Sequence, residues 1–331
     1  MRGTAVGLLL TLLLGVTPGA AARPADARRP LVVTGYAMGG LSPRVIPRDA
    51  HGLDLVGVSG IGVKPDGSGV TGTYRQLTAL RRQAHRYGLR AELLMSNWSP
   101  VTGDFDPALA TALLSDPDHR AAAVRRLDRI ARTEQWDGIT VDLEALRPRD
   151  RDDLVAFVSE LRAALPARVE LSMDIGARPS IAAYRRSGFD LGRLARHVDR
   201  IALMTYDQHG SGWSGPGPVG GLPWQRRTMK VLLSRVPAGL VDLGVAGYGY
   251  TWPSSGTGHS LSPRHARALV AGDGARAVWH RRQGEWSAAL SDGTVVWWSD
   301  ARSYRLRLAL ARGLGVHGVA LWVLGSADPL P

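Results

Sequence analysis

The feature that most constrains the fold is a regular alternation of apolar segments with helical segments. The apolar residues of the helical segments recur at helical spacing, as Leu77, Leu80 and Ala84 do before Gly88. Eight apolar segments read as buried strands, at 31–38, 53–63, 89–97, 139–144, 169–175, 201–206, 241–250 and 317–324. Strands that alternate with helices form parallel βα units, and eight such strands close a barrel. We therefore predict a (β/α)8 TIM barrel.

One stretch, at about 260–300, breaks this alternation. It contains a helical segment at 263–271 and three short aromatic segments at 277–280, 285–288 and 294–298. A Ser291-Asp-Gly293 turn separates the last two of them. We predict a small α+β insertion between the seventh strand and its helix.

The N-terminus has the pattern of a secretory signal peptide. Arg2 is followed by an apolar run at 5–16, and Ala20-Ala-Ala22 is a small-residue cleavage site. We predict a signal peptide at 1–22, a linker at 23–30 and the barrel at 31–331. The run is short for a membrane span, so we expect a secreted or cell-wall-associated bacterial protein that leaves the membrane after cleavage. The absence of cysteine excludes disulfides and cysteine nucleophiles.

The net charge of +12 comes almost wholly from arginine, since lysine occurs only at Lys64 and Lys230. This balance reflects either a compositional bias or attraction to an anionic cell-wall polymer. The chain shows no basic helix, no basic run interleaved with aromatic residues and no zinc pattern, which argues against nucleic acid as a partner. We expect a monomer.

Polar and aromatic residues gather where the predicted strands end, which is where TIM barrels form their active sites. The candidates are Asn97, Asp142, Glu144, Asp174, Tyr206, Asp207, Tyr250 and Trp322. Further candidates for sugar contacts are Trp98, Trp213, Trp224 and Trp252. The histidines are scattered, so we predict no metal site. No nucleotide-binding glycine motif follows a strand, and we expect no cofactor.

The fourth predicted strand has the strongest signal. Thr140, Asp142 and Glu144 are spaced by two and share one face, which should point into the barrel. Two carboxylates crowded inside a barrel would raise the pKa of one of them, as a general acid near neutral pH requires. The alternative is a structural role for both acids, in an ion pair or a helix cap.

These residues resemble glycoside hydrolase family 18, the family of chitinases and endo-β-N-acetylglucosaminidases. The family's D-G-x-D-x-D-x-E run is matched by Asp137-Gly-Ile-Thr-Val-Asp-Leu-Glu144, and its M-x-Y-D motif by Met204-Thr-Tyr-Asp207. Trp322 matches the eighth-strand tryptophan. The segments at 206–224, 243–250 and 318–325 are similar to the spore-germination, cortex-lytic branch. One departure is Thr140, which stands where chitinases have the middle aspartate.

The resemblance implies a retaining, substrate-assisted mechanism, in which the 2-acetamido group of the substrate replaces a protein nucleophile. Glu144 would be the general acid and base, Asp142 would orient the acetamido group, and Tyr206 would bind its oxygen. Trp322 would form the floor under the sugar. We expect substrate contacts from Asp207, Asn97, Asp174 and Tyr250. The narrower resemblance favours peptidoglycan over chitin as the polysaccharide.

Two other functions remain open at this point. Thr140 is the feature that favours a catalytically silent, lectin-like relative, whereas the retained Glu144 argues for an enzyme. An unrelated barrel enzyme such as an aldolase would need a Schiff-base lysine inside the barrel. Lys64 and Lys230 fall in a predicted loop and on a predicted helix, where neither could serve.

Overall fold

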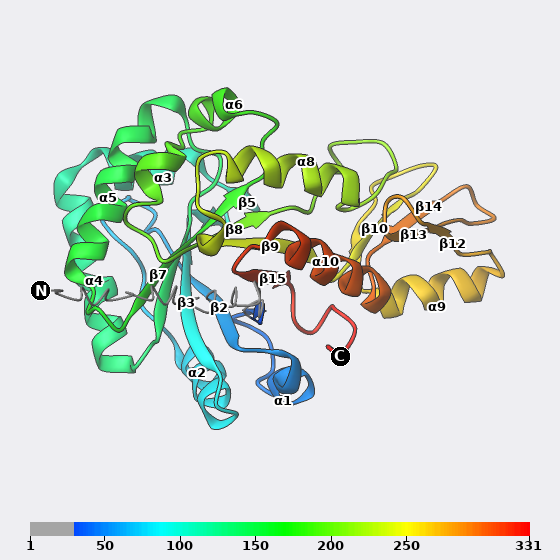
Figure 1. Ribbon diagram of the computed structural model, residues 1–331, viewed down its shortest axis with the longest axis horizontal. Helices are drawn as coiled ribbons and strands as arrows, with labels where there is room; N and C mark the ends of the chain where they lie inside the picture. Colours follow the sequence, from blue (N-terminus) through cyan, green and yellow to red (C-terminus); the bar gives the residue numbers. More distant parts are fainter. Residues whose placement is uncertain (1–29) are drawn as a thin grey trace, which may run out of the picture. The chain divides into compact units, whose positions relative to one another are not determined.

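The computed structural model describes residues 30–331, and Leu31–Pro331 forms one compact unit. The predicted signal peptide and all but the last residue of the predicted linker lie outside the described residues. Eight parallel strands close a barrel in the order β1-β2-β3-β6-β7-β8-β9-β15 (Figure 1). Their bounds are Val32–Met38, Leu55–Gly62, Arg90–Ser96, Gly138–Asp142, Glu170–Gly176, Arg200–Met204, Val241–Ala246 and Gly318–Trp322. The predicted TIM barrel is confirmed.

Helices surround this barrel and follow most of its strands. They are α1 (Val45–Asp49), α2 (Arg75–Arg86), α3 (Pro107–Ser115), α4 (Pro117–Glu134), α5 (Arg151–Ala164), α6 (Ile181–Arg186), α7 (Leu191–Leu194), α8 (Leu222–Leu233) and α10 (Ala301–Leu314). Short 3-10 turns occupy Ala50–Gly52, Pro148–Asp150 and Ala238–Leu240. Aspartate caps define several helix starts: Asp116 accepts from the backbone of Asp118 at 2.8 Å, and Asp300 from that of Arg302 at 2.9 Å.

The predicted insertion is present between β9 and α10, and its elements gather beside the barrel (Figure 1). A five-stranded sheet has the order β11-β10-β14-β13-β12. The strands are β10 (Gly249–Trp252), β11 (Ser260–Leu261), β12 (Val278–His280), β13 (Glu285–Ala289) and β14 (Val295–Trp298), and α9 (Pro263–Asp273) packs on one face. A hairpin of β4 (Trp98–Ser99) and β5 (Asp104–Phe105), which the sequence analysis did not predict, follows the third barrel strand.

The predicted seventh strand, 241–250, is two strands in the structure. β9 ends at Ala246, and the rest of the apolar run belongs to β10 in the insertion sheet. Gly249 makes the change possible, because a Cβ there would lie 2.2 Å from the carbonyl oxygen of Trp297 on β14. Both strands are apolar, so hydrophobicity alone does not mark the break. Tyr250 therefore lies on the insertion and not at the end of a barrel strand.

A buried ion pair joins the insertion to the barrel. Glu285 on β13 and Arg307 on α10 lie 3.0 Å apart, and both side chains are almost wholly inaccessible to solvent. The carboxylate also accepts from the backbone nitrogens of Val219 and Gly220, at 2.7 and 2.9 Å. These contacts offset the cost of burying the two charges. The pair therefore helps to orient the insertion on the barrel.

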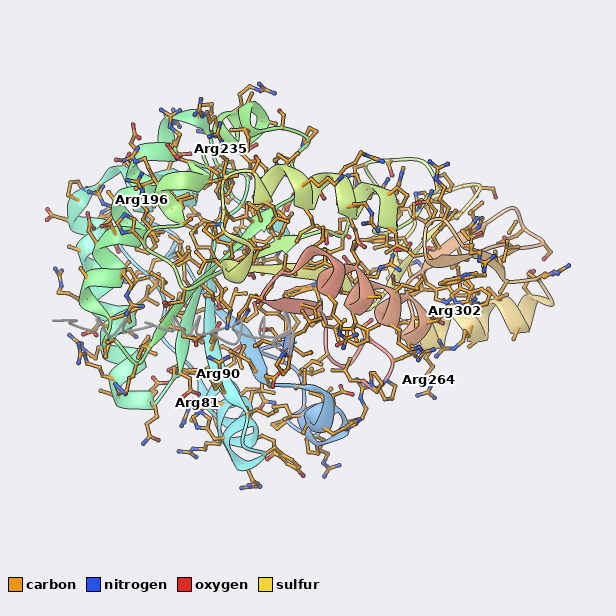
Figure 2. All side chains as sticks on the ribbon, viewed as in Figure 1. Arg81, Arg90, Arg196, Arg235, Arg264 and Arg302 are labelled. Carbon is orange, nitrogen blue, oxygen red and sulfur yellow. The ribbon has the colours of Figure 1, made fainter. Side chains whose placement is uncertain are left out.

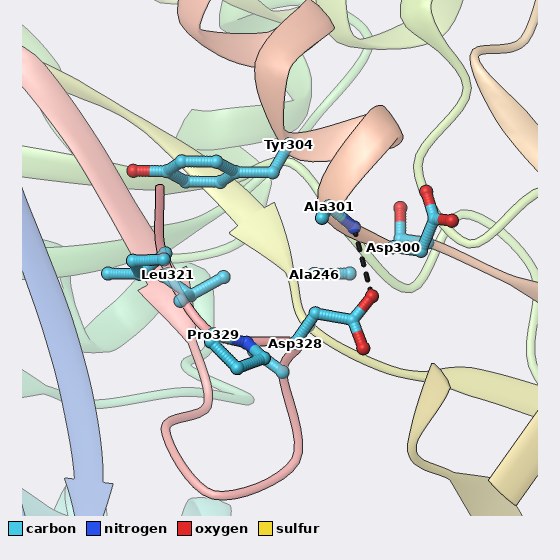
Figure 3. Close-up of a pocket in the computed structure, with 11 residues that line it drawn as sticks. Ala246, Asp300, Ala301, Tyr304, Leu321, Asp328 and Pro329 are labelled. Atoms are coloured by element: carbon cyan, nitrogen blue, oxygen red, sulfur yellow. Dashed lines mark hydrogen bonds between the residues drawn. The ribbon is translucent and has the colours of Figure 1, made fainter. Parts of the chain in front are cut away.

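The C-terminal segment packs against the start of α10. The backbone nitrogen of Ala301 donates to Asp328 at 3.2 Å (Figure 3). Arg267 of α9 forms an ion pair with the same carboxylate at 2.6 Å. The side chains of Tyr304 and Leu321 line the pocket that Ala301 and Asp328 also line (Figure 3). The end of the chain is thereby tied to both the barrel and the insertion.

Candidate active site

A cavity of about 270 Å³ opens at the C-terminal ends of the barrel strands. Six of the eight predicted site residues line it: Asp142, Glu144, Asp174, Tyr206, Asp207 and Trp322. Asn97 and Tyr250 are not part of its wall. Residues from four barrel strands and their following loops thus meet in one place, as the TIM barrel requires of its active site.

Glu144 stands just past the end of β6, and Asn97 holds its backbone in place. The amide oxygen of Asn97 accepts from the Glu144 nitrogen at 2.9 Å, and its amide nitrogen donates to the Glu144 carbonyl at 3.0 Å. The same nitrogen donates to the carbonyl of Asp106 at 2.9 Å. Asn97 is fully buried, so its amide is used by the protein itself. It positions Glu144 and is not placed to contact a substrate.

Burial raises the pKa of Glu144 to about 7. The charge of Arg178 opposes this increase, and Asp207 and Asp104 add to it. A carboxylic acid with such a pKa is substantially protonated near neutral pH, and can both donate a proton and take one back. These are the two properties that a general acid and base needs.

Asp142 and Asp174 occupy neighbouring strands at the base of the cavity. β6 and β7 pair Thr140 with Ser172 and Val141 with Met173, so the next step of the register brings Asp142 beside Asp174. Burial, followed by the charges of Glu144 and Asp174, raises the pKa of Asp142 well above its usual value. Two carboxyl groups this close in a buried site favour a state in which they hold a proton.

The two carboxyl groups differ in their partners. Tyr36 of β1 donates its hydroxyl to Asp174 Oδ1 at 2.7 Å. Burial raises the pKa of Asp174 to about 7, against this hydrogen bond, which lowers it. Asp142 Oδ1, by contrast, is buried and has no hydrogen-bond partner among the described residues. Asp142 itself lines the cavity, so its carboxylate can accept a donor from a ligand bound there.

Below this layer, Thr140 belongs to a buried polar network around Glu92. Its hydroxyl donates to Glu92 Oε2 at 3.1 Å and lies 2.9 Å from the hydroxyl of Ser172, which donates to the same oxygen at 2.9 Å. Arg200 balances the charge of Glu92 at 2.6 Å and also pairs with Asp242 at 3.5 Å. Thr140 is therefore a neutral donor to a carboxylate on another strand. The threonine that departs from the motif quoted in the sequence analysis thus has a defined hydrogen-bond partner, Glu92.

Aromatic side chains form the rest of the wall. Trp322 packs on Tyr36 with 5.6 Å between ring centroids and presents its remaining surface to the cavity. Burial and the surrounding carboxylates raise the pKa of Tyr206 well above its usual value, so its phenol stays protonated and can donate. Trp224 also lines the cavity. These groups offer flat apolar faces and one hydroxyl donor to a ring-shaped ligand.

Asp207 lies at the rim, held by two tyrosines. The hydroxyls of Tyr248 and Tyr250 donate to its Oδ1 at 2.6 and 2.9 Å. Tyr250 thus reaches the site only through Asp207, because it lies on the insertion. The backbone of Asp207 has a φ of 58°, in the left-handed region that aspartate tolerates better than most residues.

Within residues 30–331, no group of three or more histidine, aspartate or glutamate side chains is arranged to hold a metal ion. In the same part of the chain, no helix combines the length and the apolar character needed to cross a membrane.

The sequence model of the family described as glycosyl hydrolases family 18 matches residues 43–327. The chain belongs to that family. The prediction that the protein is a glycoside hydrolase is thereby confirmed at the level of the family.

Relatives of this family 18 hydrolase include two proteins of Bacillus subtilis. The glycosylase YvbX is 23% identical over 76% of this chain and 74% of that protein. A cortical fragment-lytic enzyme is 27% identical over 68% of this chain, which corresponds to 55% of that protein. The chain thus spans little more than half the length of the second relative. The second relative agrees with the resemblance to the cortex-lytic branch.

Solved structures confirm the fold of the family 18 hydrolase. A chitinase from Chromobacterium violaceum superposes with a TM-score of 0.81 at 27% identity, covering 90% of this chain and 96% of that one. The spore cortex-lytic enzyme SleL of Bacillus cereus has the same TM-score at 18% identity, covering 92% and 73% of the two chains.

Sequence reasoning missed three residues of the family 18 site. Tyr36 lies within the first predicted strand, where an apolar run hides its contact with a distant aspartate. Phe105 belongs to the unpredicted hairpin. Arg178 follows the fifth strand by two residues, but arginine is so frequent in this chain that one more near a strand end carried no signal. Only the position after a strand end could have identified it.

Proposed function

We propose that the protein is a secreted glycosidase that hydrolyses β-linked N-acetylglucosamine-containing glycans, peptidoglycan in preference to chitin. It acts with retention of configuration, by substrate-assisted catalysis. The observation that carries this proposal is the pairing of Glu144 and Asp142 in one cavity, with raised pKa values and with one Asp142 oxygen left without a partner. Such a pair suits a proton donor beside a group that receives an acetamido N–H.

The reaction proceeds in two steps. Glu144 donates its proton to the glycosidic oxygen while the acetamido carbonyl oxygen attacks C1 and the C1–O bond breaks. Asp142 accepts a hydrogen bond from the acetamido N–H and stabilises the positive charge that develops on the oxazolinium ring, while the Tyr206 hydroxyl donates a hydrogen bond to the acetamido oxygen. Glu144 then takes a proton from water, which attacks C1 and opens the oxazolinium ring. Trp322 supports the sugar from below.

Asp174 serves as the second carboxyl group beside Asp142. It takes the role of the family's middle aspartate, which would stand at position 140 on β6. The register of β6 and β7 supports this assignment, as does the hydrogen bond from Tyr36, which fixes the Asp174 carboxyl. The two acids share a proton that can move away from Asp142 when the acetamido N–H arrives. Thr140 takes no part, because its hydroxyl is committed to Glu92.

Two observations favour peptidoglycan over chitin as the proposed substrate. The relatives named above include a cortical fragment-lytic enzyme, and the chain carries a net charge of +12. Among the arginines labelled in Figure 2, Arg196 and Arg235 lie on the barrel and Arg264 lies on α9 of the insertion, well separated from one another. This wide spread of charge suits general attraction to an anionic wall better than recognition of one nucleic-acid groove.

The test is a digest of purified peptidoglycan and of chitooligosaccharides with the wild type, Glu144→Gln and the control Glu160→Gln. Glu160 lies on α5 and pairs with Arg120, away from the cavity. We expect new reducing-end N-acetylglucosamine from the wild type and the control, and at least a hundredfold less from Glu144→Gln, as the loss of a general acid implies. Mass spectrometry of the products names the polymer.

The same digest decides between the enzyme and a catalytically silent, carbohydrate-binding relative. Glycan binding with no products from any of the three proteins would favour the silent relative. Products that Glu144→Gln forms as fast as the wild type would show that the acid is another residue. Secretion is tested separately, by N-terminal sequencing of protein recovered from the culture medium, where we expect cleavage after Ala22.

A further inference from the structure

The cavity contains one cationic side chain in a lining that is otherwise acidic or uncharged. Among the described residues that form its wall, Arg178 is the only basic one, and it shares the wall with Asp142, Glu144, Asp174 and Asp207. It lies in the loop between β7 and α6. A neutral sugar polymer offers no charged group for this cation to bind.

The position of Arg178 is well defined. Its Nε donates to the hydroxyl of Ser187 at 3.0 Å, and Nη1 donates to the carbonyl of Ala177 at 3.1 Å. Its backbone nitrogen donates to the hydroxyl of Tyr184, whose side chain is fully buried, at 3.2 Å. A Cβ at Gly176 would come within 3.0 Å of Nη1, so the glycine leaves room for the guanidinium. The side chain is therefore held before any ligand arrives.

The charge of Arg178 has no counter-ion among the described residues. No carboxylate oxygen of a described residue lies within 4.0 Å of the Arg178 guanidinium, and Nη2 forms no hydrogen bond to a described residue. Of its five N–H donors two are used, which leaves three for a ligand. The positive charge nevertheless reaches Glu144, whose pKa it lowers against the effect of burial. Arg178 thus acts on the cavity without an ion pair of its own.

We propose that Arg178 binds a carboxylate of the substrate, and that the cavity selects glycans whose N-acetylated sugars carry an acid. A guanidinium binds a carboxylate through two parallel N–H donors, and Nη1 and Nη2 retain the donors for this. This inference rests on the proposed function, and it names the chemical feature that separates peptidoglycan from chitin. Chitin has no carboxylate.

Peptidoglycan can supply the carboxylate from two sources. One is the lactyl ether of N-acetylmuramic acid, which is free only after an amide-hydrolysing reaction has removed the stem peptide. The other is the stem peptide itself, whose side-chain and terminal carboxylates lie further from the sugar ring. A comparison of strands without stem peptides and strands that carry them therefore distinguishes the two sources. Both kinds of strand contain a carboxylate.

The experiment compares kcat/KM for the wild type, Arg178→Gln and the control Arg186→Gln. Arg186 lies on the exposed side of α6, and its replacement removes the same charge outside the cavity. The substrates are peptidoglycan strands without stem peptides, strands with stem peptides, the first set after conversion of its carboxylates to methylamides, and chitooligosaccharides. The methylamides keep the sugar and remove only the charge.

We expect Arg178→Gln to lower kcat/KM on the carboxylate-bearing strands by about tenfold to a hundredfold, the range for a hydrogen bond to a charged group. Most of this loss should lie in KM. We expect less than a threefold loss on methylamides and chitooligosaccharides, where the variant also proves that it folds. The control should behave as the wild type does. A larger loss on strands without stem peptides than on strands with them identifies the lactyl carboxylate.

An equal loss on all four substrates would overturn the inference, because it would mean that Arg178 acts only through the pKa of Glu144. Binding gives an independent reading. With Glu144→Gln as the background, we expect Arg178→Gln to weaken the binding of carboxylate-bearing strands about tenfold or more and to leave chitooligosaccharide binding unchanged. If the wild type cleaves no substrate, the proposed function fails, and this binding comparison still decides whether Arg178 recognises the carboxylate.

Discussion

Replacing Thr140 by aspartate would complete the family motif, yet we expect it to damage this protein. Thr140 is fully buried, and its hydroxyl donates to Glu92 Oε2 at 3.1 Å. An aspartate carboxylate cannot donate, and it would place a second negative charge beside Glu92. Arg200 is the near cation of this network, and it already pairs with both Glu92 and Asp242.

The size of the effect follows from two contributions. Loss of the hydrogen bond to a charged acceptor costs about 1.5–3 kcal/mol, and an uncompensated buried charge costs about 3–5 kcal/mol. The variant can reduce the second contribution by protonating, so we expect Thr140→Asp to lower the free energy of unfolding by about 3–5 kcal/mol in total. Thr140→Ser keeps the donor and loses a methyl group, which should cost about 1 kcal/mol.

The assay is urea denaturation of the wild type, Thr140→Ser, Thr140→Asn and Thr140→Asp across the pH range. Burial raises the folded-state pKa of the new carboxyl group above its unfolded value of about 3.9. The part of the destabilisation that comes from the buried charge is therefore full above the folded-state pKa, decreases as the pH falls, and vanishes below the unfolded value. We expect the gap in free energy of unfolding between Thr140→Asp and its neutral match Thr140→Asn to narrow from about pH 8 to about pH 5.

Two results would refute this reasoning. Thr140→Asp could be as stable as Thr140→Asn at every pH, which would mean that the network around Glu92 tolerates another charge. It could also gain activity over the wild type, which would mean that the site lacks the second carboxyl group that we assign to Asp174.

Four further outcomes are expected. Plots of kcat/KM against pH should fall above about pH 7, because Glu144 must be protonated and its pKa is raised to about 7. Asn97→Ala should lower kcat by about a hundredfold with little change in KM, since the Glu144 backbone loses its two hydrogen bonds; steady-state kinetics on one oligosaccharide measures this. Asp174→Asn should lower kcat by at least about tenfold while urea denaturation shows an intact fold, and an unchanged kcat would remove the proton-sharing role of Asp174. Glu285→Gln should lower the free energy of unfolding by about 3–5 kcal/mol, because it leaves Arg307 buried without its counter-charge; a loss under about 1 kcal/mol in urea denaturation would show that the pair is not needed.

Much of the fold could be predicted from the sequence because it depends on local periodicity. Parallel strands buried on both sides are continuous apolar runs, and the helices between them repeat every three to four residues. The same local rule put Thr140, Asp142 and Glu144 on one face, since side chains alternate along a strand. Where two strands were equally apolar, as at 241–250, periodicity could not show that the chain had left the barrel.

The chain by itself thus determined the barrel, the insertion and the acid at the end of the fourth strand. The tertiary structure alone decided which distant groups surround that acid. Tyr36 donates a hydrogen bond to Asp174, which lies 138 positions away in the sequence. Glu92 accepts a hydrogen bond from the hydroxyl of Thr140, and the Asn97 side chain binds the backbone of Glu144. Such contacts depend on the register of closed strands and on loop conformation, and neither leaves a periodic mark in the sequence.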